Sequence, residues 1–304
     1  MNELCLQAGD ASLLLLPEYG GLVNGLMLAT PVGPREVIAP VATAGLPDNP
    51  GYRGTVLFPF PNRLRDGCYC LNGTGYQFAV NEETTHTALH GVLYRHPAKV
   101  AASEQGENES RATLVWETES LDSAYPFHCR ISMEYRLHAQ DGLTVSVVID
   151  NLDQQEIPVG FGWHPYFTLS GQVNDWQLLL PEVRRQLVDE RMLPVGEPVT
   201  DTRFATPALI GATQFDECFE LQAKDAEQAV TVYSPAAGFG LAVWQQAGPQ
   251  GMNFVQLYTP PDRASLAIEP MSCGIDALNT GAGLVCLAPG ESYRGTYGVR
   301  AVNL

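Results

Sequence analysis

The sequence is poor in positive charge, and above all in lysine. Its 304 residues contain 17 Lys and Arg against 34 Asp and Glu, which gives a formal net charge of −17. Binding to nucleic acid or to an anionic membrane surface requires clustered basic side chains, and the arginines here are scattered. A Schiff-base lysine needs apolar neighbours that bury its amine. The only two lysines, Lys99 and Lys224, do not lie in apolar runs of this kind. We therefore expect no nucleic-acid partner, no membrane partner and no Schiff-base chemistry.

Targeting and redox features are also missing. Residues 1–10 lack the basic start and apolar stretch of a signal peptide, and no segment approaches the roughly 18 apolar residues of a membrane span. The seven cysteines are odd in number and widely spread, which indicates reduced thiols rather than a disulfide framework. Cys68 and Cys70 share one face of a predicted strand, and we interpret them as core side chains. A cytoplasmic location is expected.

The common catalytic signatures are absent as well. The chain has no Gly-x-Ser-x-Gly elbow, no phosphate-binding loop and no His-Glu-x-x-His motif. His86 and His90 are four positions apart, but they stand in polar, loop-like sequence, and Thr87 follows where a metalloprotease has Glu. We expect no metal site and no cofactor.

What the sequence does contain is a period of two. From His128 to Leu137 apolar and polar residues alternate, and after the turn at Asp141-Gly142 the alternation resumes and continues to Asp150. This pattern predicts two half-buried strands joined as a hairpin. The apolar, inward-facing positions are Cys129, Ile131, Met133, Tyr135 and Leu137, then Leu143, Val145, Val147 and Ile149.

Short strand-like runs continue along the whole chain. They cover 12–16, 76–80, 112–117, 229–233, 241–244, 254–258, 266–268 and 293–299. No window shows the helical period over a dozen positions, and 29 Gly and 22 Pro punctuate the sequence. These features predict a large all-β protein, an antiparallel β-sandwich with few short helices, and exclude doubly wound and (β/α) barrel folds. With no linker and no internal repeat, a single domain over residues 1–304 is expected.

Two segments place an ionisable side chain in unusual surroundings. His164 lies within Phe161-Gly162-Trp163-His164-Pro165-Tyr166-Phe167, where the following proline restricts its backbone. Glu269 ends the apolar run Leu266-Ala267-Ile268 and also precedes a proline. A buried carboxylate must find partners or become protonated. Each has a structural alternative: His164 as a core histidine bonded to a carbonyl, and Glu269 as the partner of an arginine.

Three weaker segments add polar residues beside glycine, proline or an acidic neighbour. They are Pro61-Asn62-Arg63, Leu89-His90-Gly91 and Phe215-Asp216-Glu217-Cys218-Phe219. Taken alone, none of them indicates a function, and the acidic pair at Asp216 is typical of a solvated turn.

Taken together in chain order, these segments resemble the aldose 1-epimerase family, the galactose mutarotase-like β-supersandwich proteins. The matching pieces are Asn62-Arg63-Leu64, Gly67, Tyr69, Gly73, Tyr76, Asn81, Leu89-His90-Gly91, His164-Pro165-Tyr166-Phe167, Asp216, Tyr258-Thr259-Pro260, Glu269-Pro270-Met271 and Asn279. The resemblance spans roughly residues 10–300. It departs from the family at Gly91-Val92, where many members have two glycines, and residues 169–215 supply no motif.

The resemblance implies an acid/base isomerase that interconverts the α and β anomers of an aldose. By it, His164 is similar to the general acid and Glu269 to the general base, on strands that must lie side by side or face one another. Arg63, His90 and Asp216 match positions that hold sugar hydroxyls, and Asn62 is placed with them. Trp163 or Tyr166 is expected to offer an apolar face to the ring. Such proton transfers need no metal or redox cofactor.

Other functions stay open at this point. A hexose-6-phosphate 1-epimerase, a sister activity implied by the resemblance, needs positive charge that Arg53, Arg65 and Arg95 are near enough in sequence to supply. A carbohydrate-binding module on the same sandwich needs neither His164 nor Glu269. A glycoside hydrolase needs a carboxyl pair, for which Glu269 and Asp216 are the candidates.

Overall fold

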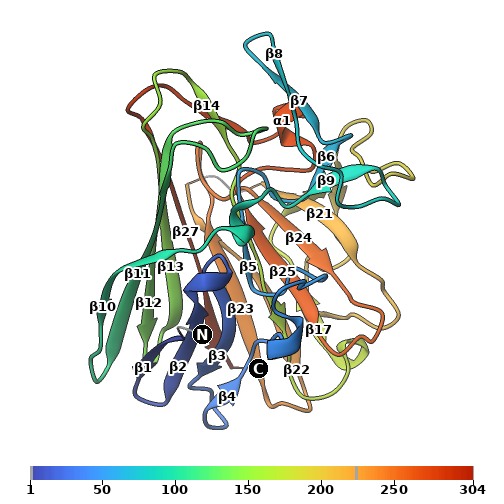
Figure 1. Ribbon diagram of the computed structural model, residues 1–304. Helices are drawn as coiled ribbons and strands as arrows, with labels where there is room; N and C mark the ends of the chain where they lie inside the picture. Colours follow the sequence, from blue (N-terminus) through green and yellow to red (C-terminus); the bar gives the residue numbers. More distant parts are fainter. Residues whose placement is uncertain (1–2, 223–224, 304) are drawn as a thin grey trace.

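A computed structural model describes residues 3–222 and 225–303, which form an almost entirely antiparallel β-structure (Figure 1). This confirms the predicted fold class, because alternating sequences bury one face of a strand in a sandwich core. Lys224 lies outside the described residues. Within these two ranges, helix is confined to short pieces: α1 (Ala277–Thr280) and the 3₁₀ turns η1 (Pro17–Tyr19), η2 (Thr43–Gly45), η3 (Leu93–Arg95) and η4 (Val173–Asp175). None of the helices in the described ranges is long and apolar enough to cross a bilayer.

One large sheet has nine strands and carries the hairpin predicted from the alternation. In spatial order they are β10 (Lys99–Glu104), β11 (Glu109–Thr118), β12 (Cys129–His138), β13 (Gly142–Asn151), β27 (Ser292–Val302), β23 (Phe239–Gln246), β22 (Glu227–Ser234), β17 (Gln177–Leu179) and β20 (Ala208–Leu209). The β12–β13 hairpin pairs Cys129 with Asn151 and His138 with Gly142. All the positions predicted to face inward on β12 and β13 are buried.

A second large sheet carries the sequence segments singled out above. Its strands, in order, are β19 (Val199–Asp201), β18 (Val183–Arg185), β21 (Asp216–Leu221), β24 (Phe254–Tyr258), β25 (Leu266–Met271), β15 (Gly162–His164) and β5 (Thr55–Leu57), with β16 (Tyr166–Phe167) also paired to β25. All the pairs in this sheet are antiparallel. Each strand therefore presents alternate residues to the core and to the opposite face.

Smaller sheets complete the fold. A four-stranded sheet contains β1 (Leu4–Ala8), β2 (Ala11–Leu16), β3 (Leu22–Leu28) and β4 (Arg35–Glu36), and three ribbons pair β6 (Arg63–Arg65) with β9 (Thr87–Leu89), β7 (Cys68–Leu71) with β8 (Thr74–Gln77), and β14 (Ile157–Val159) with β26 (Val285–Leu287). Figure 1 shows the β7–β8 hairpin projecting from the body, and the β6–β9 ribbon beside strands β21 and β24.

The core lies between the two large sheets. One cluster of buried apolar side chains takes members from nearly the whole chain, from Leu6 to Val299. Across the interior, the Trp163 ring of β15 stacks on the Tyr297 ring of β27, with centroids 5.4 Å apart. Because Trp163 faces this core, its neighbour His164 faces the opposite side of the sheet.

Two details of the sequence interpretation are wrong. Cys68 and Cys70 do share a face of β7, but it is the exposed face, because the β7–β8 ribbon turns the other face, with Tyr69 and the half-buried Leu71, toward the core. The run predicted over 76–80 also stops early, since β8 ends at Gln77 and the chain then leaves the ribbon.

Candidate functional site

The floor of the site is the part of the second large sheet where β15 and β25 run side by side. Their register pairs Gly162 with Met271, and β16 continues the same register further along β25. Counting along both strands places His164 opposite Glu269, where Pro270 interrupts the ladder because it has no N–H to donate. The two residues are therefore neighbours on adjacent strands, as an acid/base pair requires.

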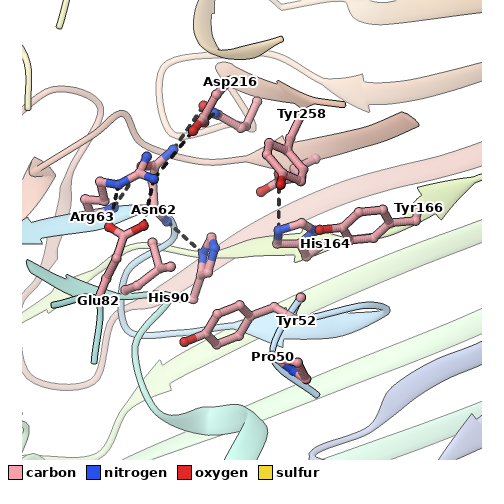
Figure 2. Close-up of a pocket in the computed structure, with 14 residues that line it drawn as sticks. Pro50, Tyr52, Asn62, Arg63, Glu82, His90, His164, Tyr166, Asp216 and Tyr258 are labelled. Carbon is pink, nitrogen blue, oxygen red and sulfur yellow. Dashed lines mark hydrogen bonds and ion pairs between the residues drawn. The ribbon is translucent and has the colours of Figure 1, made fainter. Parts of the chain in front are cut away.

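A cavity of about 250 Å³ opens on this face of the sheet (Figure 2). The chain segments that line it come from the sheet, from the loop before β5 and from the β6–β9 ribbon. The lining residues are Pro50, Gly51, Tyr52, Asn62, Arg63, Glu82, Leu89, His90, His164, Tyr166, Asp216, Gln256, Tyr258 and Glu269. All the residues expected from the sequence to act as catalytic or sugar-binding groups are among them except Trp163.

His164 and Glu269 form a close, buried pair. The Nε2 atom of His164 lies 3.4 Å from Oε1 of Glu269, and the two side chains are only 6% and 2% exposed. Among the described residues, neither Nδ1 of His164 nor Oε2 of Glu269 has a hydrogen-bond partner. Buried polar atoms are normally bonded, so these open positions leave hydrogen-bonding capacity for a ligand in the cavity.

Burial opposes charge on both members of the pair. Desolvation lowers the pKa of His164 from its ordinary value of 6.5 to about 3, and the nearby Arg53 guanidinium acts in the same direction. Desolvation raises the pKa of Glu269 well above 4.5, and the Asp216 carboxylate adds to the rise. Both shifts favour the uncharged pair, a neutral imidazole beside a carboxylic acid, in which the two groups share one titratable proton.

His90 is held as a neutral hydrogen-bond donor. The backbone N–H of Asn62 donates to Nδ1 of His90 over 3.1 Å, so the ring proton resides on Nε2. Burial, followed by the charges of His164 and Arg63, holds the pKa of His90 well below its ordinary value. A neutral imidazole with Nε2–H is suited to donate a hydrogen bond to an oxygen in the cavity.

The loop that presents His90 depends on a glycine. His90 has φ +66° and Gly91 has φ +64°, both in the left-handed region. A Cβ atom on Gly91 would lie 2.2 Å from the carbonyl oxygen of Phe58, whereas one on Gly73, with φ +81°, would meet nothing within 4 Å. Comparing alanine substitutions at these two glycines therefore distinguishes the cost of a left-handed backbone from the cost of a steric clash.

We expect Gly91→Ala to lower the free energy of unfolding by more than about 2 kcal/mol, because it combines left-handed strain with a backbone clash. Gly73→Ala, the matched control, is expected to lose only about 1 kcal/mol, from strain alone. Chemical denaturation of both variants measures the difference. Equal losses would show that the clash at Gly91 is relieved by movement of the loop.

Arg63 is fixed in place by two carboxylates. Its Nε and Nη2 atoms donate to the two oxygens of Glu82 over 2.7 and 2.9 Å, and Nη2 lies 3.5 Å from Oδ2 of Asp216. Glu82 also accepts from the hydroxyls of Thr85 and Thr87. Although burial opposes its charge, the bonds from Arg63 and Thr85 hold the pKa of Glu82 below its ordinary value. This anchoring holds the guanidinium toward the cavity. Because two carboxylates accompany one guanidinium, the group as a whole provides little positive charge for an anionic ligand.

A hydrogen-bonded chain of two amides and one carboxylate runs along the edge of the cavity. Nδ2 of Asn62 donates to Oε1 of Gln256 over 3.0 Å, and Nε2 of Gln256 donates to Oδ1 of Asp216 over 2.7 Å. The β24–β25 register places Gln256 directly opposite Glu269. The structure thus brings Asn62, Arg63, Asp216 and Gln256 together as a polar wall beside the His164–Glu269 pair.

Aromatic rings form the remaining walls. The Tyr166 ring stacks on His164 with centroids 5.0 Å apart and planes 7° apart, and the Tyr52 ring meets His90 edge-on at 4.7 Å. Tyr258 crosses Tyr166 at right angles, at 6.2 Å. These contacts restrict both imidazoles and put apolar surface beside the polar wall.

Trp163 does not take the place expected for it. It is 1% exposed and packs on Tyr297 in the core, because alternation along β15 sends it away from the face that carries His164. The expectation that Trp163 offers a face to a sugar ring is therefore wrong, whereas Tyr166 does line the cavity.

The three arginines considered for phosphate binding contact three different residues. The Arg53 guanidinium lies over the Tyr166 ring, 4.3 Å from its centroid. Arg65 is paired with Asp276 at 3.4 Å, and Arg95 lies over the ring of Tyr94. Of the three, Arg53 is the one that contacts a residue of the cavity floor.

Metal-ligand types do meet in the cavity, although no sequence spacing predicts them. Ligand atoms of His90, His164 and Glu269 all lie within 4.8 Å of one another. His86, by contrast, is exposed and faces Asp66 at 3.0 Å, so it shares no site with His90. The expectation that the protein uses no metal stays a prediction.

Sequence reasoning missed Tyr52, Glu82 and Gln256. Gln256 is 4% exposed within the apolar strand Phe254–Tyr258, and a buried amide in such a strand is a usable signal. Tyr52 and Glu82 stand in loops, and no local pattern distinguishes them from solvated residues. Only the three-dimensional arrangement brings them to the cavity.

Comparison with known proteins gives a consistent result along the whole chain. The sequence model of the family "Aldose 1-epimerase" matches residues 2–300. The uncharacterized Escherichia coli K12 protein YihR is 31% identical over 307 residues, covering 96% of this chain and 91% of YihR. Human galactose mutarotase is 27% identical over 225 residues, covering 68% of this chain and 62% of the human protein.

Solved structures show the same architecture. A galactose mutarotase-like protein from Clostridium acetobutylicum superposes with a TM-score of 0.86 at 20% identity, covering 99% of this chain and 95% of that one. At this identity the similarity establishes the galactose mutarotase-like sandwich fold.

Proposed function

This chain belongs to the aldose 1-epimerase family, and from that premise we propose that it interconverts the α and β anomers of a free aldose by acid/base ring opening and closure. The observation that carries the proposal is the pairing of His164 with Glu269, whose Nε2 and Oε1 atoms lie 3.4 Å apart at the floor of a polar cavity. Mutarotation requires one proton to leave the C1 hydroxyl and one to reach the ring oxygen, and this pair supplies both transfers.

The proton count of the pair suits the reaction. In the reactive form, Glu269 is a carboxylate that takes the C1 hydroxyl proton, and His164 is an imidazolium that gives its proton to the ring oxygen. The C1–O5 bond breaks, the aldehyde forms, and the pair is left as carboxylic acid and neutral imidazole. Burial favours this uncharged form. Ring opening therefore removes the charges from two poorly solvated groups, which favours the step. Rotation about C1–C2 and the reverse transfers give the other anomer.

Before ring opening, the same single proton must cross from Glu269 to His164. Their 3.4 Å separation allows that transfer with little movement of either side chain. The remaining cavity residues would hold the sugar: Arg63 and His90 donate to hydroxyls, and Asp216 accepts. Tyr166 offers the apolar face that Trp163 does not.

A panel of sugars tests the activity. Polarimetric or coupled measurement of anomer exchange on glucose, galactose, arabinose and glucose 6-phosphate is expected to show exchange of at least one free aldose well above buffer. Binding of these sugars without exchange would instead support a carbohydrate-binding module. Release of reducing sugar from a glycoside would support a hydrolase.

The pH dependence follows from the direction of the pKa shifts. A second proton on the pair removes the base, so activity is lost as the pH falls through the pKa of His164, which is about 3. We expect kcat/KM, corrected for buffer catalysis, to keep its plateau well below pH 6.

Circular dichroism at each pH, and recovery of activity after return to pH 7, control for acid unfolding. An acid limb centred near 6.5, the ordinary pKa of histidine, would contradict the desolvated pair and the proton count based on it.

A 6-phosphorylated aldose is the second candidate substrate, and Arg53 is the observation that favours it. Its guanidinium lies over Tyr166 beside the reacting pair, and guanidinium groups bind phosphate well. Arg63 adds little, because Glu82 and Asp216 already neutralise it. A higher kcat/KM for glucose 6-phosphate than for glucose, lost in Arg53→Ala, would establish this candidate over the free sugar.

A further inference from the structure

The strand order of the sheet orients a bound sugar, given the acid and base of the proposed function. Glu269 on β25 meets the C1 hydroxyl, and His164 on β15 meets the ring oxygen. In a pyranose, C1 is bonded to the ring oxygen on one side and to C2 on the other, and C6 is attached to C5 beyond the ring oxygen. Because the order is β21-β24-β25-β15-β5, C2 and C3 point toward β24 and β21, and C6 points toward β5.

The polar wall lies on the C2 and C3 side. Gln256 on β24 and Asp216 on β21 are joined by a hydrogen bond. Together they are suited to bind two adjacent hydroxyl groups of a sugar. Figure 2 shows Asp216 and Pro50 at opposite ends of the cavity, with the two histidines between them. The C6 end is therefore the end formed by Pro50 and Tyr52.

A second cavity begins at this end. It has a volume of about 460 Å³, shares Pro50 and Tyr52 with the first cavity, and includes Thr55 of β5 in its lining. A group attached to C6 leaves the first cavity in this direction. The volume of the second cavity exceeds the 250 Å³ that holds the reacting ring in the proposed function, so it has room for another ring.

The lining of the second cavity suits an uncharged, hydroxyl-rich group. Tyr19 and Tyr94 supply aromatic surface, and the carboxylates of Glu18 and Asp48 supply acceptors, with Arg95 as the cation. Among the residues that line this cavity, two carboxylates accompany one guanidinium, a balance that disfavours an anion within it. We propose that this cavity binds the second ring of a reducing disaccharide whose linkage is to C6 of the reducing unit.

The test compares linkages within one reducing sugar. Anomer exchange of glucose, of isomaltose, which is 6-linked, and of maltose, which is 4-linked, is followed by selective-inversion NMR, which needs no pure anomer. We expect kcat/KM for isomaltose to equal or exceed that for glucose, and to exceed that for maltose by about tenfold or more, as loss of one or two hydrogen bonds predicts. Equal rates for isomaltose and maltose would overturn the proposal.

Variants of the second cavity test the location. Asp48→Ala and Glu18→Ala are each expected to lower the isomaltose-to-glucose ratio of kcat/KM about fivefold, the effect of one lost hydrogen bond. Asp10→Ala, an exposed acidic residue at the β1–β2 turn, is the matched control and keeps the wild-type ratio. An unchanged ratio in both cavity variants would overturn the proposal, and so would a preference for glucose 6-phosphate over isomaltose.

Failure of the proposed function has a different signature. In that case none of the free aldoses glucose, galactose and arabinose, and no disaccharide of the first two, exchanges anomers above the buffer rate. Exchange of the monosaccharide without preference for the 6-linked disaccharide leaves the acid/base proposal standing and removes only the second-ring site.

Discussion

Glu269→Gln is expected to lower kcat/KM for anomer exchange by at least about a hundredfold, the usual contribution of a positioned general base. Glutamine keeps the size of the side chain but cannot accept the C1 hydroxyl proton. It also cannot supply the proton that His164 delivers to the ring oxygen. Polarimetry of a freshly dissolved pure α-aldose, with the buffer rate subtracted, measures the loss.

The stability of this variant distinguishes lost chemistry from lost structure. Glu269 is fully buried and burial raises its pKa, so replacing it with a neutral amide removes an ionisable group that the fold disfavours in its charged form. The melting temperature is therefore expected to hold or rise while activity falls. Glu220→Gln, at the far end of β21, is the control and keeps the wild-type rate. A near-normal rate in Glu269→Gln would remove Glu269 from the mechanism.

His164→Asn is expected to have a comparable effect, a loss of about a hundredfold or more. Asparagine occupies part of the imidazole volume but transfers no proton at neutral pH. The same polarimetric assay applies, with His128→Asn as the control because His128 stands just before β12, in the other large sheet. Wild-type activity in His164→Asn would show that another group protonates the ring oxygen.

The double variant adds a further test of the pair. Because the two side chains share one proton, removing both should cost about as much as removing either one, as for other groups that act as a unit. If the fold-reduction in kcat/KM of the double variant equals the product of the two single reductions, the shared-proton arrangement is contradicted.

Much of the fold was predictable because sheet structure leaves a local mark. Residues 128–150 alternate so regularly that both faces of β12 and β13 follow from the sequence. The same signal misled at Cys68 and Cys70. Alternation shows that two residues share a face, but it does not show which face is buried when the strand belongs to an outlying ribbon.

The candidate site was predictable only in pieces. His164 and Glu269 stood out as ionisable groups in apolar surroundings beside prolines, and the structure makes them neighbours. Trp163 was misplaced, since an aromatic residue adjacent to His164 in sequence faces the other side of a strand. Gln256 and Glu82 act through contacts with residues distant in sequence, which no local pattern records.

The division of labour among strands has an evolutionary consequence. In the proposed function, the proton-transfer residues stand on β15 and β25, whereas the groups suited to recognise hydroxyls stand on β21, β24 and the β6–β9 ribbon. Substitutions on the latter elements are then expected to change which sugar is accepted, while the two proton-transfer side chains stay in place; a change at Asp216 also shifts the pKa of Glu269. Under the proposed function, proteins that descend from this scaffold can therefore differ in substrate specificity while they share one acid/base reaction.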